Sequence, residues 1–140
     1  MSLEQNGLRF AAGVTMATGL GLALAAIPML SPPLRFLVDL VVWPLDGAET
    51  LLASETRLIL AIAGGLMVGW GMTIRGLAGA PLARDPQSIR AIIRNSILAW
   101  FVVDCAGSIA AGAALNLLPN LGFLALFLVP MRGAGRPATT

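Results

Sequence analysis

The chain has 140 residues, of which 57% are hydrophobic and only 11% are charged, with a formal net charge of +2. Soluble domains carry about 25% charged residues, so this composition excludes a soluble globular protein and predicts one integral membrane domain over residues 1–140. The chain has no histidine, the usual ligand of haem and of many transition metals. We therefore expect no cofactor and no metal site. Without a basic run interleaved with aromatic residues, we also expect no nucleic-acid partner.

The first membrane span is predicted over residues 9–30, an apolar run long enough to cross a hydrocarbon core of about 30 Å. Prolines end it, because proline lacks the backbone donor and disfavours helix in the residue before it. Thr18 lies on a face of small and weakly polar residues. Such faces let helices approach closely in membranes, so we expect Thr18 at a helix contact.

A short apolar stretch follows at residues 34–43, too short to cross the bilayer. Arg35 and Asp39 are four residues apart, so they share one side of a helix whose other sides are apolar. The pattern favours a short helix lying at the membrane interface, anchored by Arg35 and Trp43 at headgroup depth. A strand is the lesser alternative, because an isolated strand leaves backbone groups unpaired in lipid.

Glycines mark the second span, predicted over residues 58–77. Gly65 and Gly69 are four residues apart, which is the spacing that lets two helix backbones approach in a membrane. We expect this pair to lie at a contact with another helix or with a partner.

The third and fourth spans are predicted over residues 92–114 and 118–132, with a flexible tail over 133–140. The fourth is short, covering about 21 Å at 1.5 Å per residue. It either spans a thinned region of the bilayer or forms a re-entrant helix. The predicted fold is therefore an all-α bundle of four transmembrane helices.

The distribution of arginines predicts the orientation of the chain. Seven of the nine arginines lie on the side that holds the N-terminus, the loop between spans two and three, and the tail. Because loops rich in arginine stay in the cytoplasm, both termini are predicted to be cytoplasmic. We expect a multi-pass protein of a bacterial inner membrane.

Asp104 is the residue that most needs an explanation, because it lies near the middle of the third span. An ionised acid at that depth costs about 2.5 to 3.5 kcal/mol, and no arginine is expected at the same level. We interpret it as a neutral acid that donates a hydrogen bond across a helix interface. The alternatives are a proton or cation relay and a contact with a partner subunit or lipid.

The face of the third span that holds Asp104 carries residues of two kinds. Trp100 lies one turn before the acid, and Gly107 and Ser108 lie one turn after it. The residues of this strip are therefore bulky before Asp104 and small after it, as expected where another helix or a partner docks. Asn116 and Asn120 follow the span and are predicted to cap the turn before the fourth helix.

The stretch from Trp100 to Ser108 reads W-F-x-x-D-x-x-G-S and is followed by Gly112 and the turn asparagines. It resembles a pattern in uncharacterised small four-helix integral membrane proteins of proteobacteria. The resemblance covers about a quarter of the chain and implies the four-helix fold, with no catalytic role to carry over. Cys105 is a departure, since that pattern has serine after the aspartate.

Among function classes, these features favour a non-catalytic accessory subunit or assembly factor of a larger membrane complex, of respiratory or photosynthetic type. Small-residue helix faces suit docking to other integral membrane subunits, with lipid around them. The alternative is a small oligomeric transporter or channel in which Asp104 lines the path. An enzyme fits least, because the sequence contains no evident pairing of a nucleophile with a base.

Overall fold

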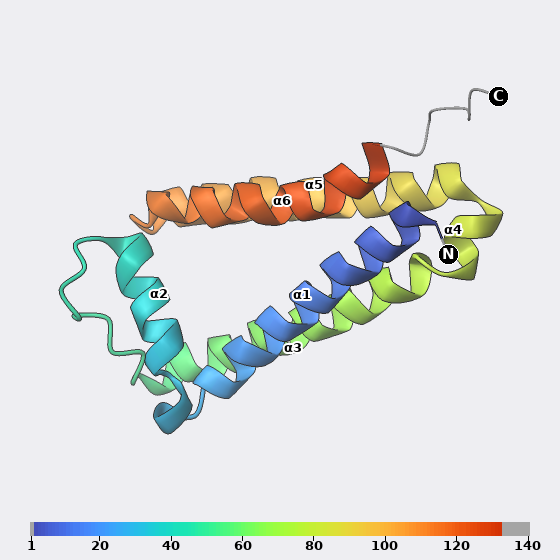
Figure 1. Cartoon of the computed structure of the whole chain (residues 1–140). Helices are drawn as coiled ribbons and strands as arrows, with labels where there is room; N and C mark the ends of the chain where they lie inside the picture. Colours follow the sequence, from blue (N-terminus) through green and yellow to red (C-terminus); the bar gives the residue numbers. More distant parts are fainter. Residues whose placement is uncertain (1, 133–140) are drawn as a thin grey trace.

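The computed structural model describes residues 2–132, and all regular structure in that range is helical (Figure 1). Four helical segments are long and apolar enough to cross a membrane. Their main helices are α1 (Leu3–Ala25), α3 (Ser54–Leu77), α5 (Pro86–Ala110) and α6 (Leu117–Arg132). The prediction of an all-helical, multi-pass membrane protein is confirmed at this level. The predicted tail, 133–140, lies outside the described residues.

Four shorter elements connect the long helices. They are η1 (Pro28–Leu30), α2 (Pro32–Val42), α4 (Ala80–Arg84) and η2 (Ala114–Asn116). The short helix predicted at 34–43 is therefore present as α2, two residues earlier at its start. The sequence did not predict α4, a single turn or so of helix between α3 and α5.

Helix α1 begins six residues before the predicted span of 9–30 and ends five residues before its end. A capping box starts the helix early: the Gln5 backbone N–H donates to Ser2 Oγ at 3.2 Å, and the Ser2 N–H donates to Gln5 Oε1 at 2.9 Å. The helix ends at Ala25, because Pro28 begins a separate 3-10 turn.

The start and the end of α5 also correct the predicted bounds of 92–114. Asp85 precedes the helix and accepts a hydrogen bond from the Ser88 backbone N–H at 3.1 Å. The Ser88 side chain, and then this backbone bond, lower the pKa of Asp85. The helix ends at Ala110, and Gly112 then adopts φ +79°, a conformation that favours glycine. Asp104 consequently lies six residues, or about 9 Å, from the end of α5. It is not at the middle of its helix.

The four long helices form two pairs, α1 with α3 and α5 with α6 (Figure 1). The pairs meet at the end of the molecule where α1 begins, α4 lies and α6 ends, which we name the terminal end. They diverge toward the opposite end, named the loop end, which holds α2 and η2. There α2 contacts η2 and so connects the two pairs across their open side. The molecule is therefore a wedge.

Glycines set the close approach of α1 and α3. A Cβ atom added at Gly19 would lie 2.7 Å from the Gly64 carbonyl oxygen, and one added at Gly71 would lie 2.9 Å from the Ala12 carbonyl oxygen. Backbone therefore lies against backbone along this pair. At the loop end Arg57 Nε donates to the Ala26 carbonyl at 2.8 Å, which ties the start of α3 to the end of α1.

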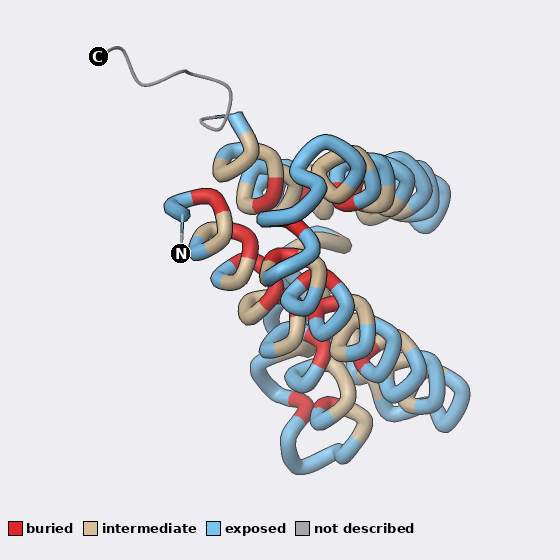
Figure 2. Tube along the Cα trace, turned by 90° about the vertical axis from the view of Figure 1, so that its right-hand side faces the viewer, coloured by how far each residue is buried: buried red, intermediate tan, exposed pale blue. Residues whose placement is uncertain are grey.

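The buried core lies near the terminal end, where the pairs meet (Figure 2). It consists of Leu8, Ala11, Ala12, Ile74, Ala78, Leu82, Ile93, Ile97 and Phe127. Beside it Arg90 donates to both carboxylate oxygens of Glu4, at 2.6 and 2.7 Å. Glu4 is only 8% exposed, so this ion pair joins α1 firmly to α5.

Candidate functional site

A polar cluster surrounds Asp104 where α5 and α6 lie side by side near the loop end. The Nδ2 groups of Asn116 and Asn120 both donate to Asp104 Oδ2, at 3.3 and 2.5 Å. Asn116 Nδ2 also donates to Ser108 Oγ at 2.9 Å, and Asn120 Nδ2 lies 3.6 Å from Cys105 Sγ. Asn120 is buried, and the other members are half-buried. The cluster therefore binds α6 and η2 to α5 through side chains.

In the structure Asp104 accepts hydrogen bonds through one oxygen, and its predicted role as a neutral donor stays a prediction. Its Oδ2 atom accepts two hydrogen bonds from amide groups, which satisfy this half-buried oxygen. The asparagine side chains, predicted to cap the turn, instead bind Asp104. Among the described residues, no hydroxyl or indole group has a hydrogen bond to Asp104; Ser108 is linked to it only through Asn116.

One signal in the sequence could have identified this cluster. Asp104 and Ser108 are four residues apart, and so are Asn116 and Asn120. Asp104 and Ser108 therefore share one face of α5, while Asn116 in η2 and Asn120 in α6 lie about one helical turn apart. Because a short turn returns α6 antiparallel beside α5, the two pairs come level with each other.

Trp100 belongs to a group of aromatic side chains on three helices. Its ring centroid lies 6.2 Å from that of Trp70 on α3 and 5.3 Å from that of Phe123 on α6. Phe127 extends the group, at 6.0 Å from Trp70. These rings join the two helix pairs, with Phe127 in the buried core and the other rings packed against it. Trp100 is thus an internal packing residue, and its predicted contact with a partner stays untested.

The small residues predicted at interfaces face outward. A Cβ atom added at Gly65, Gly69 or Gly107 would meet nothing within 4 Å, and all three residues are exposed. Thr18 is exposed as well. The glycines that contact α1 from α3 are Gly64 and Gly71, which lie about 100° or more around the helix from Gly65. A role for the outward residues in binding a partner stays a prediction.

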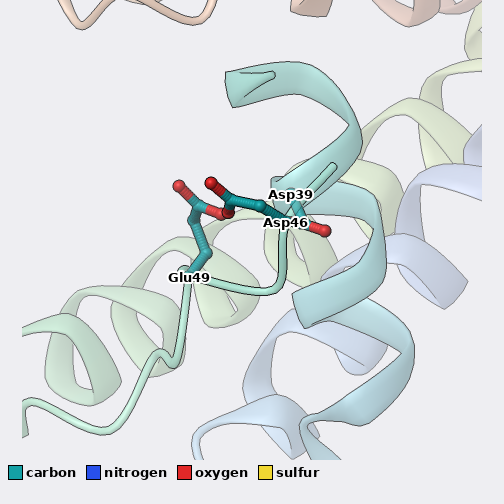
Figure 3. Close-up of side chains that lie close together, drawn as sticks. All are labelled: Asp39, Asp46 and Glu49. Carbon is teal, nitrogen blue, oxygen red and sulfur yellow. The ribbon is translucent and has the colours of Figure 1, made fainter. Parts of the chain in front are cut away.

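Three carboxylates form a second polar group at the loop end, which the sequence did not predict. They belong to Asp39 on α2 and to Asp46 and Glu49 on the loop that follows, and Figure 3 shows them close together. One oxygen atom from each lies within 4.8 Å of the others. The Gly47 N–H donates to Asp39 Oδ1 at 2.9 Å, and Arg35 Nε donates to the Glu49 carbonyl at 3.3 Å. These bonds fold the loop back onto α2.

The electrostatics of this group follow from the crowding of like charges. The hydrogen bond with Asp39 raises the pKa of the Glu49 carboxyl above its ordinary 4.5, with desolvation and the neighbouring charges adding to the shift. Oxygen ligands of this kind suit Ca²⁺ or Mg²⁺. Protonation of Glu49 relieves the same repulsion, so the grouping alone does not make a metal site.

The predicted interfacial anchors lie at opposite ends of α2. Trp43 follows the last turn of α2 and is 63% exposed, so its ring is available to a membrane interface. Arg35 is half-buried because its guanidinium holds the loop. Their position relative to a bilayer stays a prediction.

Two open grooves lie away from Asp104. One, of about 490 Å³, borders the Glu4–Arg90 pair at the terminal end. The other, of about 580 Å³, is an apolar groove between Trp43 at the end of α2 and Leu115 in η2. Neither is lined by Asp104.

In comparisons with known proteins, no protein-family model, no curated protein and no solved structure matches this chain. The resemblance of the third span to small proteobacterial membrane proteins therefore remains a prediction. The function must be argued from the geometry of the wedge itself.

Proposed function

We propose that this chain is a non-catalytic accessory subunit or assembly factor of a larger membrane complex, of respiratory or photosynthetic type. Its site would be the bacterial inner membrane, with both termini in the cytoplasm and α2 at the opposite membrane interface. The observation that carries the proposal is the outward-facing pair Gly65 and Gly69 on α3, with open space beside both.

The physical argument concerns what glycine contributes in a membrane. Lipid chains are as apolar as leucine, so helices associate through close backbone packing, which glycine permits. Within the chain, α3 uses Gly64 and Gly71 in this way against α1. The outward pair at Gly65 and Gly69 offers a second helix the same kind of approach.

The Asp104 cluster supports the non-catalytic part of the proposal. Ser108 Oγ accepts from Asn116 and has no hydrogen bond to Asp104, and Cys105 Sγ contacts only an amide. Nucleophilic catalysis needs a nucleophile bonded to its base. The described residues of this cluster contain no such pair.

Native mass measurement of the tagged chain, extracted from its own membranes in mild detergent, tests the proposal. We expect a heteromeric complex that is lost when Gly65 and Gly69 are both changed to leucine. Gly122→Leu is the matched control, because it adds the same bulk at an open position of α6. A homo-oligomer whose transport is lost in Asp104→Asn would instead favour the transporter.

A further inference from the structure

Asp104 and the open strip beside it form a feature that the accessory role does not by itself explain. Gly107 and Ala111 lie three and seven residues after Asp104, so they share its side of α5. Both are exposed, and a Cβ atom at Gly107 would meet nothing within 4 Å. A neighbouring helix can therefore approach closely just beside the carboxylate.

The carboxylate has partial solvation but no counter-charge. Two amides donate to Oδ2, and no ion pair reaches Asp104 from any residue in the range 2–132. Ionisable groups inside membrane helices are costly, and they are usually paired with a group of opposite charge. A cationic side chain is thus the complement that this site lacks.

The described arginines of this chain are poorly placed to supply the cation from a second copy. Of those in residues 2–132, Arg35 and Arg57 lie near the loop end, and the Nε group of each already donates to a backbone carbonyl of its own chain. The other described arginines lie toward the terminal end or in the first three turns of α5, away from Asp104 along the helix axis. These positions favour a different protein as the source of the cation.

We infer that Asp104, together with Gly107 and Ala111, receives a transmembrane helix of another subunit that carries one arginine or lysine about 9 Å from its outer end. That depth matches the distance of Asp104 from the end of α5, at 1.5 Å per residue. The inference rests on the proposed accessory function and names the chemistry of the partner helix.

The test uses the full chain in phosphatidylcholine liposomes and a synthetic polyleucine transmembrane peptide with one arginine six residues from one end. The same peptide with leucine in place of arginine is the reference. Energy transfer between labels on the tagged chain and the peptide reports their association. We expect the arginine peptide to associate about tenfold more tightly, a ratio in the range of polar contacts between membrane helices.

Two variants locate the contact. Asp104→Asn should abolish the preference for arginine while preserving most of the shape of the side chain. Asp46→Asn, an acid of the exposed loop at the same end, should leave it unchanged. Gly107→Leu should weaken binding of the arginine peptide without disturbing the fold, because it extends into open space; Gly122→Leu on α6 should not.

Equal association of the two peptides would overturn the inference, as would a preference that survives Asp104→Asn. Asp104→Asn also controls for the lipid, because a preference caused by contact of the arginine peptide with headgroup phosphates would survive that change. The proposed function is tested by a different outcome. If the native complex still assembles with Asp104→Asn, the cationic partner helix is contradicted and the accessory function is not. The absence of any heteromeric complex in native membranes defeats the accessory role, whatever the peptides show.

Discussion

The two helix pairs of this protein are held together by different physics. The α1–α3 pair relies on glycines that bring the two backbones into contact. The α5–α6 pair relies on side chains, with the Asp104 cluster near the loop end and the tilted contact of Trp100 with Phe123 toward the terminal end. In lipid, where apolar burial does little to drive helices together, both close packing and polar contacts can do so.

The two pairs should tolerate different kinds of amino-acid substitution. A backbone contact cannot adjust, so an added methyl group must separate the helices. A side-chain cluster can lose one hydrogen bond and retain another. Steric changes should therefore damage the α1–α3 pair most, and polar changes should damage the α5–α6 pair most.

The largest effect is expected for Gly64→Ala. Its Cβ atom would meet the Gly19 carbonyl and lie 2.6 Å from the Ala23 backbone nitrogen. We expect a loss of about 1–3 kcal/mol in the free energy of unfolding, measured by denaturation in detergent. Gly65→Ala, one residue away and facing open space, is the control. Equal losses from the two changes would contradict close backbone packing of this pair.

Asn120→Ala should have the next largest effect, because it leaves Asp104 without its buried amide donor. We expect a loss of about 1–2 kcal/mol. A double-mutant cycle with Asp104→Asn should give a coupling of about 0.6 to 1.7 kcal/mol between the two side chains. Additive losses would show that the amide and the carboxylate act independently.

A smaller effect is expected where the two pairs are joined. Arg90→Gln removes the bidentate contact with Glu4, and the arginine is 32% exposed, so solvent screening limits the loss to about 1 kcal/mol. The combined exchange Glu4→Arg with Arg90→Glu should recover part of the stability. If the exchange recovers nothing, the residues stabilise the terminal end through packing rather than charge.

The smallest effect is expected in the loop, outside both pairs. Because the pKa of Glu49 is raised in the folded protein, its contribution to stability is fully present below its ordinary pKa of 4.5 and is lost as the pH rises through the raised value. Glu49→Gln imitates the protonated form, so it should flatten this pH dependence. Thermal unfolding of both proteins across that interval measures it. An unchanged pH profile would contradict the coupling to Asp39.

Much of the fold could be predicted because it depends on local sequence. Apolar length predicts the long helices, and proline, glycine and capping residues predict roughly where they end. The errors in the bounds also have local causes: the capping box at Ser2 and the turn at Gly112 lie in regions that hydropathy alone does not distinguish. The carboxylates of Asp39 and Glu49 meet only because the loop folds back onto α2, which no local pattern encodes.

The sequence by itself determined that the protein is a multi-pass helical membrane protein and that Asp104 needs a partner. Length, hydropathy and the cost of a charge in lipid are sufficient for that. Only the tertiary structure decided that the partners are Asn116 and Asn120, and that Gly64 rather than Gly65 contacts α1. Which face of a helix meets which neighbour depends on how two helices cross, and several pairings satisfy the same hydrophobic pattern.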